Sequence, residues 1–238
     1  MPKFNTVFLQ LIVMVMSFAP LGVFCLIGKF VIADGLDIFQ DVLAYVVLLI
    51  SLLLFHAFFT YSLFLKFVGR LNPITFFKKM KNVAIFAFST SSSAATIPVT
   101  LKTVNHDLGV NQNVASFVVP VGATINMDGT AIMQGLATVF IAQMSGIDLS
   151  LFQYIQVVLL AVATSIGTAA VPSAGTITLI IILQQFNLPL EAIGIILAVD
   201  RVLDMIRTSV NVTGDAAIAC IVAKSENQLD ENIFNSKT

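Results

Sequence analysis

Residues 89–98 read Ser-Thr-Ser-Ser-Ser-Ala-Ala-Thr-Ile-Pro in the middle of an otherwise apolar segment. Hydroxyl side chains and a proline offer the backbone alternatives to helical hydrogen bonds, so this segment is not an ordinary membrane-spanning helix. Lys102 follows almost at once, and basic residues also precede the segment. We therefore predict a re-entrant helical hairpin over residues 83–104 that enters and leaves the membrane on the cytoplasmic side.

The composition of the chain is that of a membrane protein. Its 238 residues are 58% hydrophobic and 11% charged, whereas soluble domains are about half apolar and about a quarter charged. The net charge of −1 gives no electrostatic basis for binding nucleic acid. Cys25 and Cys220 lie far apart in apolar stretches, which argues against a disulfide framework and a cysteine metal cluster. We therefore expect membrane lipid as a partner and no nucleic acid.

Two apolar segments precede the hairpin. A spanning helix needs about 20 apolar residues, and we predict such helices within residues 1–33 and over 42–65. Basic residues from Lys66 to Lys81 follow the second helix, and basic loops stay in the cytoplasm. We therefore expect a multi-pass protein of the cell membrane with both termini in the cytoplasm, including a tail over 225–238.

A second interrupted segment, residues 151–186, repeats the pattern of the first. Its interruption begins with Thr164-Ser165 and reaches Val171-Pro172, just as Thr90-Ser91 leads to Ile97-Pro98 at the same spacing. Irregular backbone survives at membrane depth only where protein or water surrounds it, so we predict a second re-entrant hairpin over residues 151–186. A serine- and glycine-rich helix-packing face is the alternative for either segment alone.

Each hairpin is followed by a long apolar segment with an Asn-x-x-Gly motif. Residues 114–142 contain Asn126-Met127-Asp128-Gly129-Thr130, and residues 192–224 contain Asn211-Val212-Thr213-Gly214-Asp215. If the first hairpin enters from the cytoplasm, the second enters from outside, so the two halves have inverted topology. Paired interrupted segments in inverted halves indicate the site of a secondary transporter. The predicted fold is an all-α membrane protein with spanning helices and two re-entrant hairpins in inverted repeats.

Charged and amide side chains in the last apolar segment form one polar stripe. A charge at the bilayer centre costs about 2.5–3.5 kcal/mol, so each charge needs a partner. Helical spacing relates Asp200, Asp204, Arg207, Asn211 and Asp215. Structural ion pairs are the favoured interpretation for Asp200 and Arg201, which lie near the helix end and could reach the interface. The planar guanidinium of Arg207 suits a carboxylate and Asp204 suits an ammonium group, which together indicate an acidic amino acid.

Asp128 and Asp215 offer hard oxygen ligands, and each lies close to an asparagine amide. With no histidine or cysteine near them in the sequence, a sodium-type ion suits them better than a transition metal. His56 and His106 have no catalytic partner in the sequence, and we expect structural roles for both.

Together these motifs resemble those of the sodium-coupled dicarboxylate/amino acid symporters, the family of glutamate and aspartate transporters. The resemblance rests on the tips 91–98 and 165–175, the motif 126–130 and the stretch 200–215, and it covers the chain from about residue 4. It implies cotransport of aspartate, glutamate or a dicarboxylate with sodium ions by alternating access, with the second hairpin as the extracellular gate. It implies that the protein is not an enzyme. An intramembrane aspartyl protease is the rival hypothesis, but the sequence lacks the Gly-x-Gly-Asp motif that this class would need.

The resemblance also implies roles for individual residues. The implied substrate contacts are Arg207, Asp204, Thr208, Asn211, Thr130, Ser92, Ser93, Val171 and Gly175. One sodium site is implied at Asp215, Asn211, Asn126 and the Gly122 carbonyl. A second is implied at the carbonyls of Thr124, Ser165, Ile166 and Thr168 with the Met127 sulfur, and a third at Asn126 and Asp128.

The sequence departs from the family pattern at several positions. Ser91 is an arginine in some prokaryotic members, and Gln134 stands where proton-coupled animal relatives have a glutamate, which favours sodium coupling without proton cotransport. In the hairpin tips, serine or glycine of the family pattern is replaced by Ala94, Ala170 and Ser173. The family also carries four further membrane segments before the point where this chain begins, including most of the scaffold that forms a homotrimer. The alternative expectation is therefore a truncated or split-gene product that is inactive without that half.

Overall fold

A long apolar helix is the first element that the structure describes. The computed structural model describes residues 21, 24, 25, 28, 32 and 38–236, so the helix predicted within residues 1–33 lies largely outside the described residues. Helix α3 (Ile38–Phe55) continues directly into a π-helical turn (His56–Thr60), α4 (Tyr61–Leu63) and a second π-helical turn (Phe64–Val68). Residues Phe39–Val68 are long and apolar enough to cross a membrane. The span expected over 42–65 lies within them.

The first hairpin consists of α5 (Pro73–Thr90) and α6 (Ser93–His106). It begins at Pro73 rather than at residue 83 because this proline occupies the first helical turn, directly after an asparagine whose side chain accepts the Ile74 N–H. The lysines in this stretch suggested a loop, but they are part of α5.

The tips of the two hairpins differ in conformation although their prolines have the same spacing. In the first hairpin the chain turns at Ser91, which is left-handed with φ of 50°, and Ser92 caps α6 by accepting the Ala95 N–H. Pro98 therefore lies inside α6 and does not end the break. In the second hairpin, by contrast, Pro172 belongs to an irregular tip that separates the two helices.

The second hairpin is formed by α9 (Leu151–Ile166) and α10 (Ala174–Gln185). A reciprocal pair of bonds between Ser150 and Gln153 starts α9. The irregular tip, residues 167–173, ends at Ser173, which has a left-handed φ of 58°.

The segment predicted as one helix over 114–142 is broken in the middle. Helix α7 (Gln112–Ile125) and helix α8 (Asp128–Met144) are separated at Asn126 and Met127, whose backbone dihedrals leave the helical region. The break frees the backbone groups of both helix ends at this position. The corresponding segment near the C-terminus behaves differently, because α11 (Ile193–Ser225) runs through its own motif without interruption.

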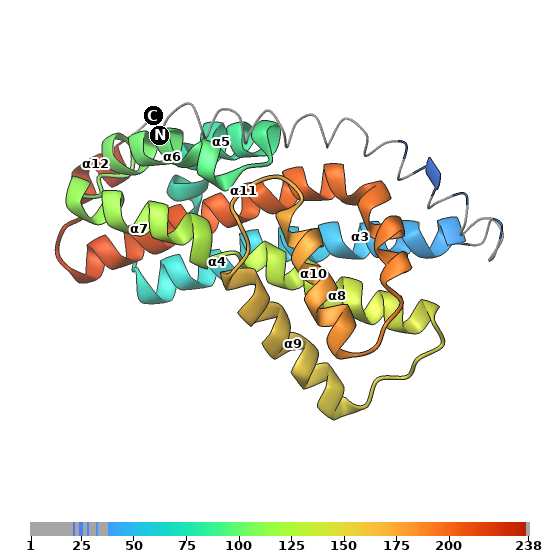
Figure 1. Ribbon diagram of the computed structural model, residues 1–238. Helices are drawn as coiled ribbons and strands as arrows, with labels where there is room; N and C mark the ends of the chain where they lie inside the picture. The colour runs from blue at the N-terminus through green and yellow to red at the C-terminus, as the bar shows by residue number, and fades with distance from the viewer. Residues whose placement is uncertain (1–20, 22–23, 26–27, 29–31, 33–37, 237–238) are drawn as a thin grey trace, which may run out of the picture.

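Helix α11 forms the common wall of two halves (Figure 1). One hydrophobic cluster joins α11 to α3, α8, α9 and α10, and its fully buried members include Leu49, Met133 and Leu179. A second cluster joins α11 to α5, α6 and α7, with Phe76 and Val104 fully buried. The first hairpin with α7 and the second hairpin with α8 therefore occupy opposite halves of the molecule, as Figure 1 shows.

The C-terminal segment, residues 228–236, which belongs to the tail expected over 225–238, packs against the base of the first hairpin. Its backbone pairs with the loop after α6 at Val110 and Leu229, and Phe234 of α12 (Glu231–Asn235) is fully buried. The ammonium of Lys79 donates to the carbonyls of Asp107 (2.8 Å) and Ile233 (2.7 Å). Lys79 therefore joins the hairpin, the loop and the C-terminal segment.

Replacing Lys79 with methionine should lower the stability of the fold. The change keeps the aliphatic stem but leaves two carbonyls without their charged donor, which costs about 2 kcal/mol. Thermal melting of the purified protein in detergent measures the effect. Lys78→Met is the matched control, because Lys78 is exposed on the same helix, and equal melting temperatures for the two variants would contradict this account.

Candidate functional site

A small polar pocket lies where the hairpin tips, the α7–α8 break and α11 meet. The residues that line it are Ser91, Ser93, Met127, Thr130, Thr168, Ala169, Ala170, Val171, Gly175, Asp204, Arg207, Thr208 and Asn211. The set includes all the expected substrate contacts except Ser92. Ser91, Ala169 and Ala170 were not among the expected residues.

The tips of the two hairpins are in direct contact above this pocket. The carbonyl of Ala170 accepts a hydrogen bond from the Ser92 hydroxyl (2.8 Å) and one from the Ala94 N–H (3.3 Å). Ser92 therefore uses its side chain to join the tips, and it does not line the pocket. Two segments that are far apart in the sequence thus close the site from opposite halves.

Arg207 lies at the centre of a buried charge cluster on α11. Its Nη2 donates to Asp204 Oδ1 at 2.5 Å and lies 3.4 Å from Asp200 Oδ1. All three side chains are at most 6% exposed. Arg207 Nη1 is buried without a hydrogen-bond partner in the described part of the chain, so a donor remains for an anionic group.

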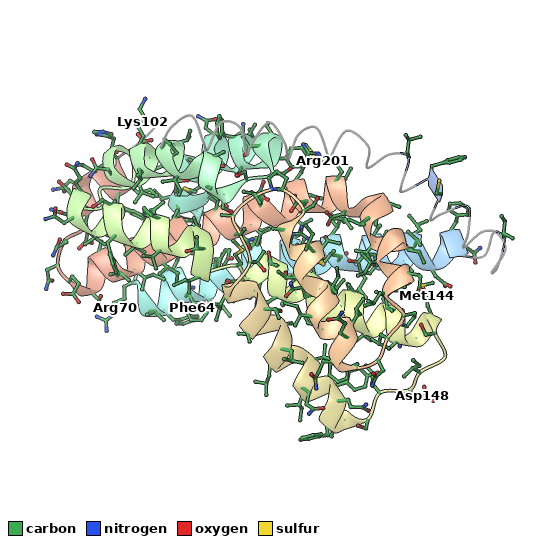
Figure 2. All side chains as sticks on the ribbon, in the orientation of Figure 1. Phe64, Arg70, Lys102, Met144, Asp148 and Arg201 are labelled. Atoms are coloured by element: carbon green, nitrogen blue, oxygen red, sulfur yellow. The ribbon has the colours of Figure 1, made fainter. Side chains whose placement is uncertain are left out.

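The second hairpin is bonded to both aspartates of this cluster. The N–H of Ser173 donates to Asp204 Oδ2 (2.9 Å), and the Thr176 hydroxyl donates to Asp200 Oδ1 (2.7 Å). The expectation that Asp200 reaches the interface is wrong, because it is 2% exposed and faces α10. Arg201 is exposed at the outer edge of the molecule (Figure 2).

Asn211 connects α11 to the start of α8. Its Oδ1 accepts the Gly129 N–H at 2.8 Å, and its Nδ2 lies 3.4 Å from Thr130 Oγ1. One amide side chain therefore satisfies a backbone donor released by the α7–α8 break. The contact also brings Asn211 and Thr130, both expected to touch substrate, to the same wall of the pocket.

Three members of the first expected sodium site lie together beyond the pocket. Asn126 Nδ2 donates to Asp215 Oδ1 (3.0 Å), and Asp215 is 2% exposed. A Cβ atom on Gly122 would lie only 2.5 Å from that same oxygen, so the absence of a side chain allows the carboxylate to approach. The fourth member, Asn211, lies one helical turn from Asp215 on α11.

Asp128 faces the π-helical part of the spanning helix. Its Oδ2 lies 3.0 Å from His56 Nε2 and 3.1 Å from the Tyr61 hydroxyl. His56 therefore has an acidic partner that the sequence did not reveal, because 72 residues separate the two. Asn126, the other residue expected at the third sodium site, donates its side-chain hydrogen bond to Asp215.

The residues of the second expected sodium site come from three elements. Met127 and Thr168 line the pocket, and Ser165 is buried at the end of α9. The side chains of Thr124 and Ile166 are exposed, so only their carbonyls could serve an ion. Helices α7 and α9, which carry these two residues, are in contact.

Gln134 anchors the second hairpin to α8. It is fully buried; its Nε2 donates to the Gly175 carbonyl (3.0 Å) and to Thr178 Oγ1 (2.7 Å), and its Oε1 accepts from Thr164 Oγ1 (2.8 Å). A carboxylate could donate neither of the first two bonds, and a protonated carboxyl group could donate only one of them. The amide at this position therefore fits a neutral hairpin anchor.

Comparisons with known proteins agree with this architecture. The family model described as "Sodium:dicarboxylate symporter family" matches residues 1–225. The chain is 43% identical to an excitatory amino acid transporter of Caenorhabditis elegans over 220 residues, which are 92% of this chain and 44% of that protein. It is also 43% identical to excitatory amino acid transporter 2 of Mus musculus (98% of this chain, 43% of the relative) and of Homo sapiens (95% and 40%).

The chain spans about two fifths of the length of these curated relatives. The described residues form a helical fold with two hairpins and a broken helix between them, which is consistent with the fold of a membrane transporter. The chain belongs to the sodium:dicarboxylate symporter family.

Proposed function

We propose that this protein carries an acidic amino acid, aspartate or glutamate, across the cell membrane together with sodium ions by alternating access. The observation that carries the proposal is the Asp204–Arg207 pair inside a pocket closed by two hairpin tips. A guanidinium recognises a carboxylate by a two-bond fork, and a carboxylate recognises an ammonium group. An acidic amino acid presents both groups, whereas a plain dicarboxylate would be repelled by Asp204.

The substrate would replace contacts that the protein makes with itself. Asp204 is occupied by Ser173 and Arg207, so an incoming ammonium group competes with the tip of the second hairpin. The side-chain carboxylate of the substrate would pair with Arg207, while Thr208, Asn211 and Thr130 supply polar contacts. Because the second hairpin bonds directly to Asp204, it is the gate that opens for substrate.

Sodium supplies the driving force in this proposal. Oxygen ligands from Asp215, Asn126 and the Gly122 carbonyl suit a hard monovalent cation. A bound cation would also compensate the buried charge of Asp215, which has an amide but no cationic partner among the described residues. Ion binding at this site and at Asn211 would favour substrate binding, since Asn211 reaches both regions.

Charge distribution supports the orientation in the membrane. Arg70 and Lys102 lie at the end of the molecule that contains the first hairpin, and Asp148 lies at the opposite end (Figure 2). The positive-inside rule places the first hairpin on the cytoplasmic side and the second on the outer side. Exposed apolar residues of α9, such as Phe152 and Leu159, suit contact with lipid or with the scaffold of a homotrimer.

Replacing Arg207 with cysteine should abolish binding and uptake of aspartate, because no other cation lines the pocket among the described residues. A neutral amino acid such as serine should still bind, since Asp204 remains. Arg207→Lys controls for folding: it keeps the charge but loses the fork, and we expect a loss of about 100-fold in aspartate affinity. The measurement is sodium-dependent aspartate binding to each variant in lipid nanodiscs. Unaltered aspartate binding by Arg207→Cys would rule out the assignment.

Replacing Gly122 with alanine should raise the sodium concentration needed for half-maximal aspartate binding. The new methyl group would meet the Asp215 carboxylate at 2.5 Å and displace it from Asn126. We expect a shift of about ten-fold, the cost of one charged hydrogen bond. Gly135→Ala is the matched control, because nothing lies within 4 Å of its Cβ position. The sodium site is placed wrongly if both variants respond to sodium like the unsubstituted protein.

A further inference from the structure

Thr176 and Asp200 form a bond immediately behind the pocket that the proposed transport mechanism does not use. Thr176 lies in the first turn of α10 and is fully buried, and its hydroxyl donates to Asp200 Oδ1 at 2.7 Å. Neither residue lines the pocket, so neither touches the substrate. The same Asp200 oxygen lies 3.4 Å from Arg207 Nη2, so it is shared between the gate and the substrate-binding guanidinium.

We propose that Asp200 is a positioning residue for Arg207 and that Thr176 couples it to the second hairpin. When the hairpin is closed, the Thr176 hydroxyl donates to Asp200, and Nη1 of Arg207 stays free to serve the pocket. When the hairpin opens, Asp200 loses this donor and draws Arg207 toward itself. This inference rests on the proposed function, because it assumes that Arg207 binds the carboxylate of the substrate.

The distances around Arg207 match a shared acceptor. The bond from Arg207 Nη2 to Asp204 is short (2.5 Å) and its bond to Asp200 is long (3.4 Å), as expected if the Asp200 oxygen is shared with the Thr176 hydroxyl. A buried carboxylate that loses a donor must find another, because the unpaired charge is costly. Arg207 is the cation within reach of Asp200 in the described structure.

Atoms for a tighter pair with Asp200 are already available. Asp200 Oδ2 and Arg207 Nη1 are both buried without hydrogen-bond partners in the part of the chain that the structure describes. A small rotation of the guanidinium would let the two groups form a two-bond fork. The proposal therefore gives the charge cluster two arrangements. In one, Arg207 can bind the substrate in the pocket, and in the other it is paired with Asp200.

The consequence is a positive coupling between closure of the gate and binding of the acidic substrate. Closure makes Arg207 available to the substrate. A substrate bound to Arg207 in turn keeps this arginine from competing with Thr176 for Asp200, so each event favours the other. If Asp200 served only to neutralise a buried arginine, removing the Thr176 hydroxyl would loosen the hairpin without weakening the affinity of Arg207 for the substrate. The affinity, and not the exchange alone, thus distinguishes the two roles.

The test uses Thr176→Val, which keeps the shape of the side chain without the donor, and Thr176→Ser, which keeps the hydroxyl. Hydrogen–deuterium exchange of the protein in lipid nanodiscs, without substrate, reports on the hairpin tip over residues 167–176. We expect faster exchange there in Thr176→Val and unchanged exchange in Thr176→Ser. Calorimetric titration with aspartate in sodium buffer should show about ten-fold weaker binding for Thr176→Val alone.

A double-mutant cycle with Asp200→Asn completes the test. The variant that carries both Asp200→Asn and Thr176→Val should bind aspartate as Asp200→Asn does, because the hydroxyl acts through the carboxylate. Additive effects, or a Thr176→Val protein with unchanged exchange and affinity, would overturn the inference. If the unsubstituted protein binds no aspartate, the proposed function fails, and the proposed positioning of Arg207 fails with it. The exchange measurement still decides whether Thr176 holds the hairpin.

Discussion

The buried ion pair between Arg207 and Asp204 is the interaction on which the rest of the structure depends. Both side chains are buried, with 3% and 6% of their surface exposed, and neither charge is tolerated there alone. Their partners come from the tip of the second hairpin and from the next turn of α11, so the pair fixes where that hairpin closes. In the proposed function, recognition of substrate and closure of the gate therefore use the same atoms.

The two broken elements place uncommitted backbone groups around this pair. The α7–α8 break frees N–H and carbonyl groups, one of which is bonded by Asn211. The hairpin tips provide others, and the Ala170 carbonyl joins one tip to the other. Irregular backbone of this kind is costly inside a membrane unless protein or ions satisfy it, so the same feature that weakens the helices creates the site.

Sequence reasoning predicted the elements well where the pattern was local. The polar stripe from Asp200 to Asp215 lies on one buried face of α11, as its helical spacing indicated. The serines of residues 89–93 predict the tip of the first hairpin correctly, whereas Pro98 does not mark its end. A proline near the start of α6 is accommodated, whereas the left-handed Ser91 makes the turn.

Contacts between distant segments could not be predicted in the same way. Nothing in the sequence near His56 indicates Asp128, because the π-helical turns that orient the spanning helix have no clear signature. The bond between Thr176 and Asp200 is equally hidden, since it depends on how closely α10 packs against α11. The packing of the C-terminal segment against the first hairpin is hidden for a similar reason, because Lys79 finds its acceptors only in the folded chain.

The central claim is that one pocket binds an acidic amino acid and that sodium sites beside it control the affinity. Calorimetric titration of the protein in lipid nanodiscs with L-aspartate, at increasing sodium and with choline as the replacement cation, tests this claim most directly. The account predicts that affinity rises steeply with sodium and that binding is lost in choline. An affinity for aspartate that is the same in sodium and in choline would contradict it.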